Sequence, residues 1–96
     1  MRMMMKVTVP VERGNAAFRD GTLKRVIDKL MTDLEPESAY FHDLRGKRAM
    51  TMVFDMKDTS QIPAIAEPLF TELDAGVSCT PVMNIDDLRK GLAALS

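Results

Sequence analysis

His42 and Tyr40 are the residues of this chain best suited to chemistry, and they stand two positions apart. They are the single histidine and the single tyrosine of the sequence. An imidazole exchanges a proton near neutral pH and could act as a general acid or base, while the phenol could orient a substrate oxygen. A structural hydrogen bond close to a turn would explain the same histidine without catalysis, so both interpretations stay open.

Lys6 is a further candidate, because it is the one charged residue of the apolar-rich segment 3–9. Facing a cavity, its ammonium group could bind an anionic substrate, or titrate at a lowered pKa if it were desolvated. A lysine that extends along apolar surface to reach solvent is the alternative. The other predicted ligand-binding residues share its side of the expected sheet: Thr8, Thr51, Val53 and Thr80.

Several other chemistries lack the residues they need. Cys79 is the only cysteine, and one cysteine with one histidine cannot supply a zinc site from those ligands alone. The 13 basic and 14 acidic side chains are intermixed and give a formal net charge of −1. That distribution is unlike the one-sided basic surface of a nucleic-acid binder. The sequence therefore predicts no metal, no cofactor and no nucleic-acid partner.

The composition predicts one globular domain that spans residues 1–96, with 46% hydrophobic and 28% charged residues. No run of about 20 apolar residues is present, so we expect no membrane-spanning segment. The single cysteine can form no intrachain disulfide, which favours a cytoplasmic location. The nine methionines suit an irregular core or an adaptable pocket.

The candidate residues lie on segments whose alternating pattern predicts β-strands. Residues 3–9 alternate, and residues 38–55 have the pattern of a hairpin folded about residues 44–47. Pairing across that turn places His42 opposite Ala49 and Tyr40 opposite Thr51, on one face. The other face of the hairpin is expected to meet the helices through Ala39, Phe41, Met50, Met52 and Phe54. A last strand is expected at residues 77–83, at a sheet edge because it contains a proline.

Two amphipathic helices and a short third one are expected between and after the strands. The first carries an apolar residue every three or four positions over residues 23–34, with Asn15 as its expected N-cap and Gly21 as a possible kink. The second follows residues 58–60 and contains Pro68, which should kink it or divide it. Asn84 is expected to cap the short last helix, whose apolar line is Leu88, Leu92 and Leu95.

This order of elements predicts an α+β fold of the ferredoxin-like βαββαβ type. Both long helices would cover one face of a four-stranded antiparallel sheet, and the short helix would follow at the end. The opposite face would be half apolar, and monomers rarely expose a contiguous apolar patch of more than a few hundred Å². We therefore expect a homodimer in which two sheets pack face to face about a two-fold axis.

Four short strings carry a resemblance to a known family. They are Gly14-Asn15-Ala16-Ala17, Asp20-Gly21-Thr22-Leu23, Phe54-Asp55-Met56-Lys57-Asp58 and Pro81-Val82-Met83-Asn84. These strings resemble a family of small uncharacterised bacterial proteins within the dimeric α/β-barrel superfamily, and the similarity spans nearly the whole chain. The resemblance implies a barrel cavity between two subunits. The superfamily includes small monooxygenases, isomerases and ligand-binding domains, so no single reaction is implied.

Three functions follow as expectations. The first is a homodimer that binds a small apolar or weakly polar molecule between its sheets. The second is a cofactor-independent enzyme of the monooxygenase or isomerase type, in which His42 and Tyr40 handle protons. The third is a structural dimer with a filled barrel. Few titratable groups face the expected cavity, which favours binding over catalysis, but the sequence leaves open whether the chain is an enzyme.

Overall fold

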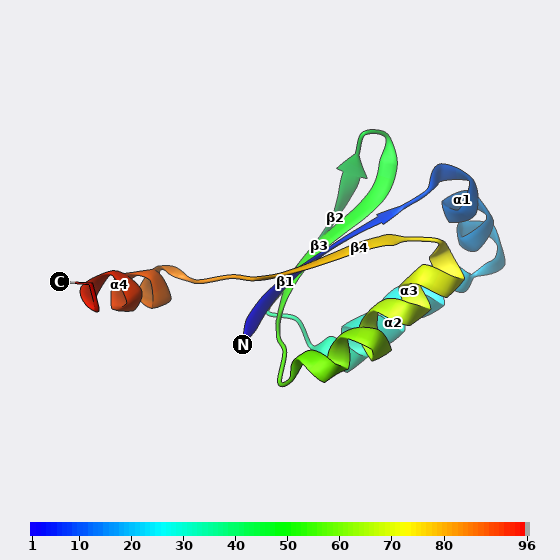
Figure 1. Ribbon diagram of the computed structural model, residues 1–96. Helices are drawn as coiled ribbons and strands as arrows, with labels where there is room; N and C mark the ends of the chain where they lie inside the picture. Colours follow the sequence, from blue (N-terminus) through cyan, green and yellow to red (C-terminus); the bar gives the residue numbers. More distant parts are fainter. Residues whose placement is uncertain (96) are drawn as a thin grey trace.

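The computed structural model describes residues 1–95 and shows an α+β fold with one four-stranded antiparallel sheet (Figure 1). The strands are β1 (Arg2–Val9), β2 (Ser38–Leu44), β3 (Lys47–Asp55) and β4 (Gly76–Pro81). The helices are α1 (Val11–Asp20), α2 (Thr22–Leu34), α3 (Ile62–Leu73) and α4 (Ile85–Ala93), and a 3-10 turn η1 (Thr59–Gln61) precedes α3. The last strand is therefore shorter than the expected segment 77–83.

The strands lie in the order β2-β3-β1-β4, and every neighbouring pair is antiparallel. The predicted register of the hairpin is confirmed, because Tyr40 pairs with Thr51 and His42 with Ala49. Arg45 and Gly46 form its two-residue turn, with φ angles of 53° and 79°. Positive φ at both central residues is the backbone of a type I′ turn, one of the two turn types that two-residue hairpins favour. β4 is an edge strand, as Pro81 predicted.

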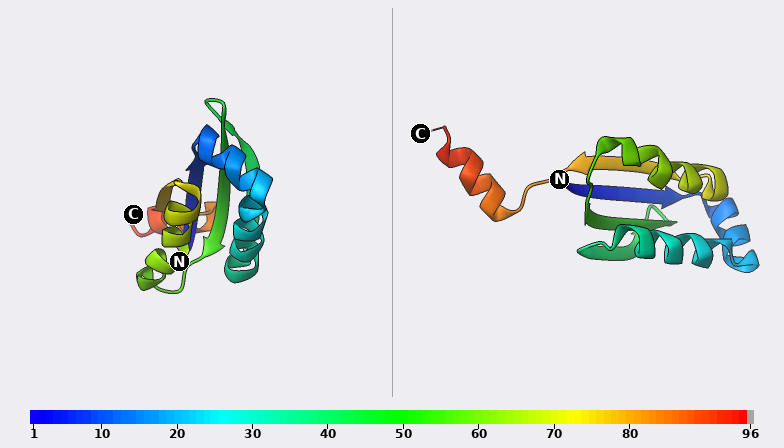
Figure 2. Two further views of the ribbon diagram at one scale, coloured as in Figure 1. Left: turned by 90° about the vertical axis from the view of Figure 1, so that its right-hand side faces the viewer. Right: turned by 90° about the horizontal axis from the view of Figure 1, so that it is seen from below.

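Helices α2 and α3 lie over the same face of the sheet, as the right-hand view of Figure 2 shows. The core between the two layers is rich in methionine. Its strand-side members are Met3, Met5, Val7, Val9, Met50, Met52 and Phe54, joined by Met56. The helices contribute Ala17, Val26, Leu30, Leu69 and Leu73. Phe41 was expected to meet the helices but is 53% exposed, because β2 is the outermost strand on its side of the sheet.

The first helical segment departs from the sequence prediction at its start. Helix α1 begins directly after Pro10, so Asn15 lies in its interior and its predicted role as N-cap is wrong. Proline suits a helix start, because its φ is already helical and the first N–H groups have no partner in any case. The Asn15 Oδ1 instead accepts a hydrogen bond of 3.0 Å from Arg48 Nη1 on β3. Gly21, with φ 84°, separates α1 from α2.

The second helical segment stays in one piece. Helix α3 runs from Ile62 to Leu73 with Pro68 inside it. Of the two expected outcomes, a kink or a division at the proline, the division is therefore wrong. Proline leaves the carbonyl of residue i−4 without its helical partner. Here that residue is the exposed Ala64, whose carbonyl can be hydrated instead. Asp58 caps the preceding 3-10 turn η1 with a capping box to Gln61.

One pair of substitutions on β1 tests which face of the sheet is buried. Met5→Ala removes a side chain with no exposed surface, and we expect it to lower the free energy of unfolding by about 2–5 kcal/mol. Met4→Ala is the matched control on the opposite face, where the side chain is only partly buried. Urea unfolding followed by circular dichroism measures both. Equal losses for the two variants would contradict the one-sided core.

Candidate functional site

All of the predicted site residues lie on the face of the sheet that α2 and α3 leave uncovered. The strand registers arrange this face in three rows across β2, β3, β1 and β4. The rows are Ser38–Val53–Met4–Thr80, Tyr40–Thr51–Lys6–Ser78 and His42–Ala49–Thr8–Gly76. We call these twelve residues the open face. The registers therefore bring the predicted site residues from all four strands onto one surface. These residues are His42, Tyr40, Lys6, Thr8, Thr51, Val53 and Thr80.

The open face mixes exposed polar groups with partly covered apolar ones. The Tyr40 side chain is 70% exposed, and Lys6, His42 and Thr80 are exposed as well. Met4 and Val53 are partly buried and lie side by side in the first row. Lys6 occupies the centre, because β1 is flanked by β3 and β4. A lysine in this position can meet a ligand or a second protein surface from the middle of the sheet.

His42 makes two local hydrogen bonds. Its Nε2 lies 3.0 Å from Thr51 Oγ1, and its Nδ1 lies 3.0 Å from the carbonyl oxygen of Asp43. A carbonyl oxygen only accepts, so the Nδ1 contact requires a proton on Nδ1. In the neutral ring, Nε2 then accepts from the Thr51 hydroxyl. The geometry thus provides the structural hydrogen bond considered above, and it also aims the basic nitrogen of the ring along the open face.

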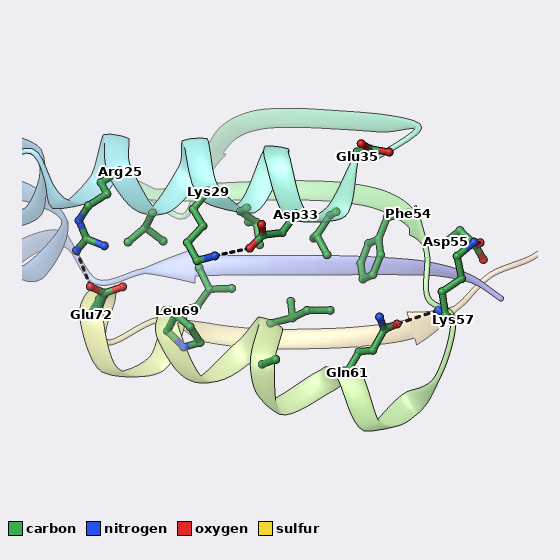
Figure 3. Close-up of a pocket in the computed structure, with 16 residues that line it drawn as sticks. Arg25, Lys29, Asp33, Glu35, Phe54, Asp55, Lys57, Gln61, Leu69 and Glu72 are labelled. Carbon is green, nitrogen blue, oxygen red and sulfur yellow. Dashed lines mark hydrogen bonds and ion pairs between the residues drawn. The ribbon is translucent and has the colours of Figure 1, made fainter.

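A second candidate site lies on the other side of the sheet, between α2 and α3, where sequence reasoning did not expect one. It is a hollow of about 440 Å³, shown in Figure 3 and called here the helix groove. Its apolar lining is Val26, Leu30, Leu34, Phe54, Ala64, Ile65, Pro68 and Leu69. Pro68, the proline inside α3, is among the lining residues, whereas the neighbouring Glu67 is exposed and is not.

Ion pairs form the rim of the helix groove. Arg25 Nη2 lies 2.5 Å from Glu72 Oε1, across from α2 to α3, and Lys29 Nζ lies 2.7 Å from Asp33 Oδ2 along α2. Hydrogen bonding to Glu72 raises the pKa of Arg25 above its ordinary value. An apolar floor with charges of both signs at its edges suits an amphipathic ligand more than a bare ion.

A smaller, ionic hollow lies at the end of the sheet, around Arg2. Arg2 Nε donates to Glu37 Oε1 at 2.5 Å, and Arg2 Nη1 donates to Asp87 Oδ2 at 3.3 Å. Nearby, a hydrogen bond from Lys57 and another from the Met1 amino group lower the pKa of Asp55 to about 2. The charges of this hollow are thus paired with one another, and its main effect is to join β1 to the segments on either side.

Cys79 lies on the helix side of β4, opposite the buried Met5, and is partly buried. Burial raises the pKa of its thiol, which makes it a weaker nucleophile at neutral pH. Within residues 1–95, no three histidine, cysteine or acidic side chains gather closely enough to hold a metal ion. In the same part of the chain, none of the helices has the length and apolar character needed to cross a lipid bilayer.

No protein-family model matches the chain, and no curated protein is similar to it at a significant level. The interpretation of the two sites therefore rests on their geometry. The open face offers a broad, weakly polar surface with one central cation. The helix groove offers a narrow apolar floor with paired charges at its edge. The first arrangement suits a face-to-face partner with a ligand between, and the second suits an inserted apolar segment.

Proposed function

We propose that two copies of this chain pair through their open faces, and that the space between the two sheets binds a small apolar or weakly polar molecule. The subunit in this proposal is ferredoxin-like. That assignment is supported by the antiparallel strand order β2-β3-β1-β4 and by the position of α2 and α3 over one face. The family resemblance of the sequence supports the same pairing of subunits.

The exposure of the open face is the observation that carries this proposal. Tyr40, Met4 and Val53 lie on a surface that no helix of residues 1–95 covers, next to threonine and serine side chains. A surface of this kind loses less by dehydration than a charged one and gains from burial of its apolar parts. Packing against a second copy would cover the face and place the same residues on both walls of the intervening space.

The chemistry of the walls indicates the kind of ligand. With His42 neutral, Lys6 is the only charged side chain among the three rows of the open face. Thr51 and Ser78 flank Lys6 in the middle row. Tyr40 supplies an aromatic surface with a hydroxyl at the end of the same row. The inferred ligand therefore has an apolar body and one anionic or oxygen-acceptor group that Lys6 can reach.

Thr51→Arg tests the pairing of the open faces. It places a second cation beside Lys6 in the centre of the proposed interface, and we expect the mass in sedimentation velocity to fall by half at micromolar concentration. Thr32→Arg is the matched control, since it makes the same change on the exposed surface of α2. Pairing through the open face would be refuted if both variants kept the mass of the unmodified protein.

Lys6→Met tests the ligand chemistry, with 1-anilinonaphthalene-8-sulfonate as a probe that has an apolar body and one anionic group. We expect the affinity to fall about tenfold, the ~1.4 kcal/mol that one modest ionic contact supplies. Fluorescence titration measures the affinity, and Lys24→Met on the surface of α2 serves as control. An unchanged affinity in Lys6→Met, with the mass preserved, would remove Lys6 from the site.

The enzymatic alternative rests on the hydrogen bond between His42 Nε2 and Thr51 Oγ1, beside Tyr40. In that case His42 would act as the base and Tyr40 would orient a substrate oxygen. A hundredfold loss of turnover of a quinol substrate in His42→Ala, with mass and melting temperature preserved, would favour this alternative. A ligand whose affinity is unchanged by His42→Ala would favour the binding interpretation. A space filled by side chains, with no room for the probe, would favour the purely structural dimer.

A further inference from the structure

Helix α4 forms an arm at the end of the chain. Figures 1 and 2 show it pointing away from the sheet and from the other helices. Its start is well defined, because Asn84 Oδ1 accepts from the Asp87 N–H at 2.8 Å and Asp87 Oδ2 accepts from the Asn84 N–H at 3.2 Å. No residue of α4, Ile85–Ala93, is buried. A hydrogen bond of 3.3 Å from Arg2 Nη1 on β1 to Asp87 Oδ2 joins the arm to the sheet.

The apolar side chains of the arm lie along one line of the helix. Ile85, Leu88 and Leu92 follow the i, i+3, i+7 spacing and are 56%, 39% and 55% exposed, and Leu95 follows them. A helix of this length is only marginally stable in water by itself, and most helices gain their stability from packing of an apolar face. The arm therefore carries the pattern by which amphipathic helices insert into apolar grooves.

The helix groove matches this line in length and chemistry. Ile85 to Leu92 rises about 10 Å along the helix axis, and the groove-lining part of α2, Arg25 to Leu34, rises about 14 Å. The floor of the groove is apolar, and so is the line of side chains on the arm. The arm carries both signs of charge beside its apolar line, Asp86 and Asp87 followed by Arg89 and Lys90, and the rim of the groove carries both signs as well.

The arm cannot reach the groove of its own chain unless the contacts that hold its first residues break. The Val82 N–H still donates to the carbonyl oxygen of Arg2 at 3.1 Å, and Asn84 is already the cap of α4. Met83 is thus the single residue between the last sheet-type contact and the helix. The arm leaves the sheet in the direction opposite to α2 and α3 (Figure 1). A groove on another chain faces no such restriction.

From these observations we infer that α4 of one chain docks into the helix groove of a second copy of the same chain. Ile85, Leu88 and Leu92 meet the apolar floor between α2 and α3, and the charges beside the line meet the rim. Reciprocal exchange of two arms repeats the contact about a two-fold axis. The groove lies on the side of the sheet opposite the open face, so this contact is separate from the proposed pairing of sheets and can link such pairs further.

Cysteine cross-linking between full-length chains tests this docking. Both chains carry Cys79→Ala. One also carries Ala64→Cys in the lining of the groove, and the other, isotopically heavy, carries Gly91→Cys on the arm, where an added Cβ meets open space. We expect a short bismaleimide to give a light–heavy heterodimer at micromolar concentration. Leu88→Asp with Leu92→Asp in the arm chain should reduce its yield at least tenfold, whereas Arg89→Ala, beside the line, should not.

Two further experiments distinguish this docking from the alternatives. With Thr51→Arg in both chains, the heterodimer persists if the arm docks independently of the open face, and its loss would refute that independence. A chain carrying both cysteines that cross-links only to itself would show that the arm occupies its own groove, and would overturn the inference. The inference would also be overturned if no heterodimer formed, or if Leu88→Asp with Leu92→Asp left the yield of heterodimer unchanged. Circular dichroism verifies folding, and Leu92→Ser provides a milder variant with the same expected direction.

Discussion

The central strand β1 is paired on both sides, with β3 and with β4, and buries Met3, Met5, Val7 and Val9 beneath the helices. Successive side chains of a strand point to opposite faces. Burial of this set therefore directs Met4, Lys6 and Thr8 to the other face, and the registers carry the same division to the neighbouring strands. The open face and the position of Lys6 at its centre are consequences of how the core is packed.

The same constraint leaves two surfaces uncovered in the structure of residues 1–95 of this 96-residue chain: the weakly polar open face and the apolar helix groove. A domain of this size buries a smaller share of its surface than a large one does, and association is a common way to bury more. The open face lies on one side of the sheet and the helix groove on the other, while the arm extends beyond both. The two proposed contacts therefore use different surfaces and need not compete.

Local patterns in the sequence predicted those features that local chemistry decides. The hairpin register was predictable because Gly46 marks the turn and the apolar residues alternate around it, and Asn84 was predictable as a cap from its own side chain. Asn15 was assigned wrongly, because Pro10 already provides a helix start. The helix groove had no sequence signal, since it depends on the spacing of α2 and α3. The sequence gives the apolar line of α4 but not its direction in space.

Fluorescence of Tyr40 offers the most direct test of the open-face pairing, because it is the single tyrosine, the chain has no tryptophan, and the ring lies on that face. Collisional quenching by acrylamide can be measured over a dilution series. The proposal predicts that Tyr40 is protected at micromolar concentration and becomes accessible as dilution separates the subunits. Quenching that is equally efficient at every concentration, in a sample whose mass still exceeds 10.7 kDa, would contradict the pairing of the open faces.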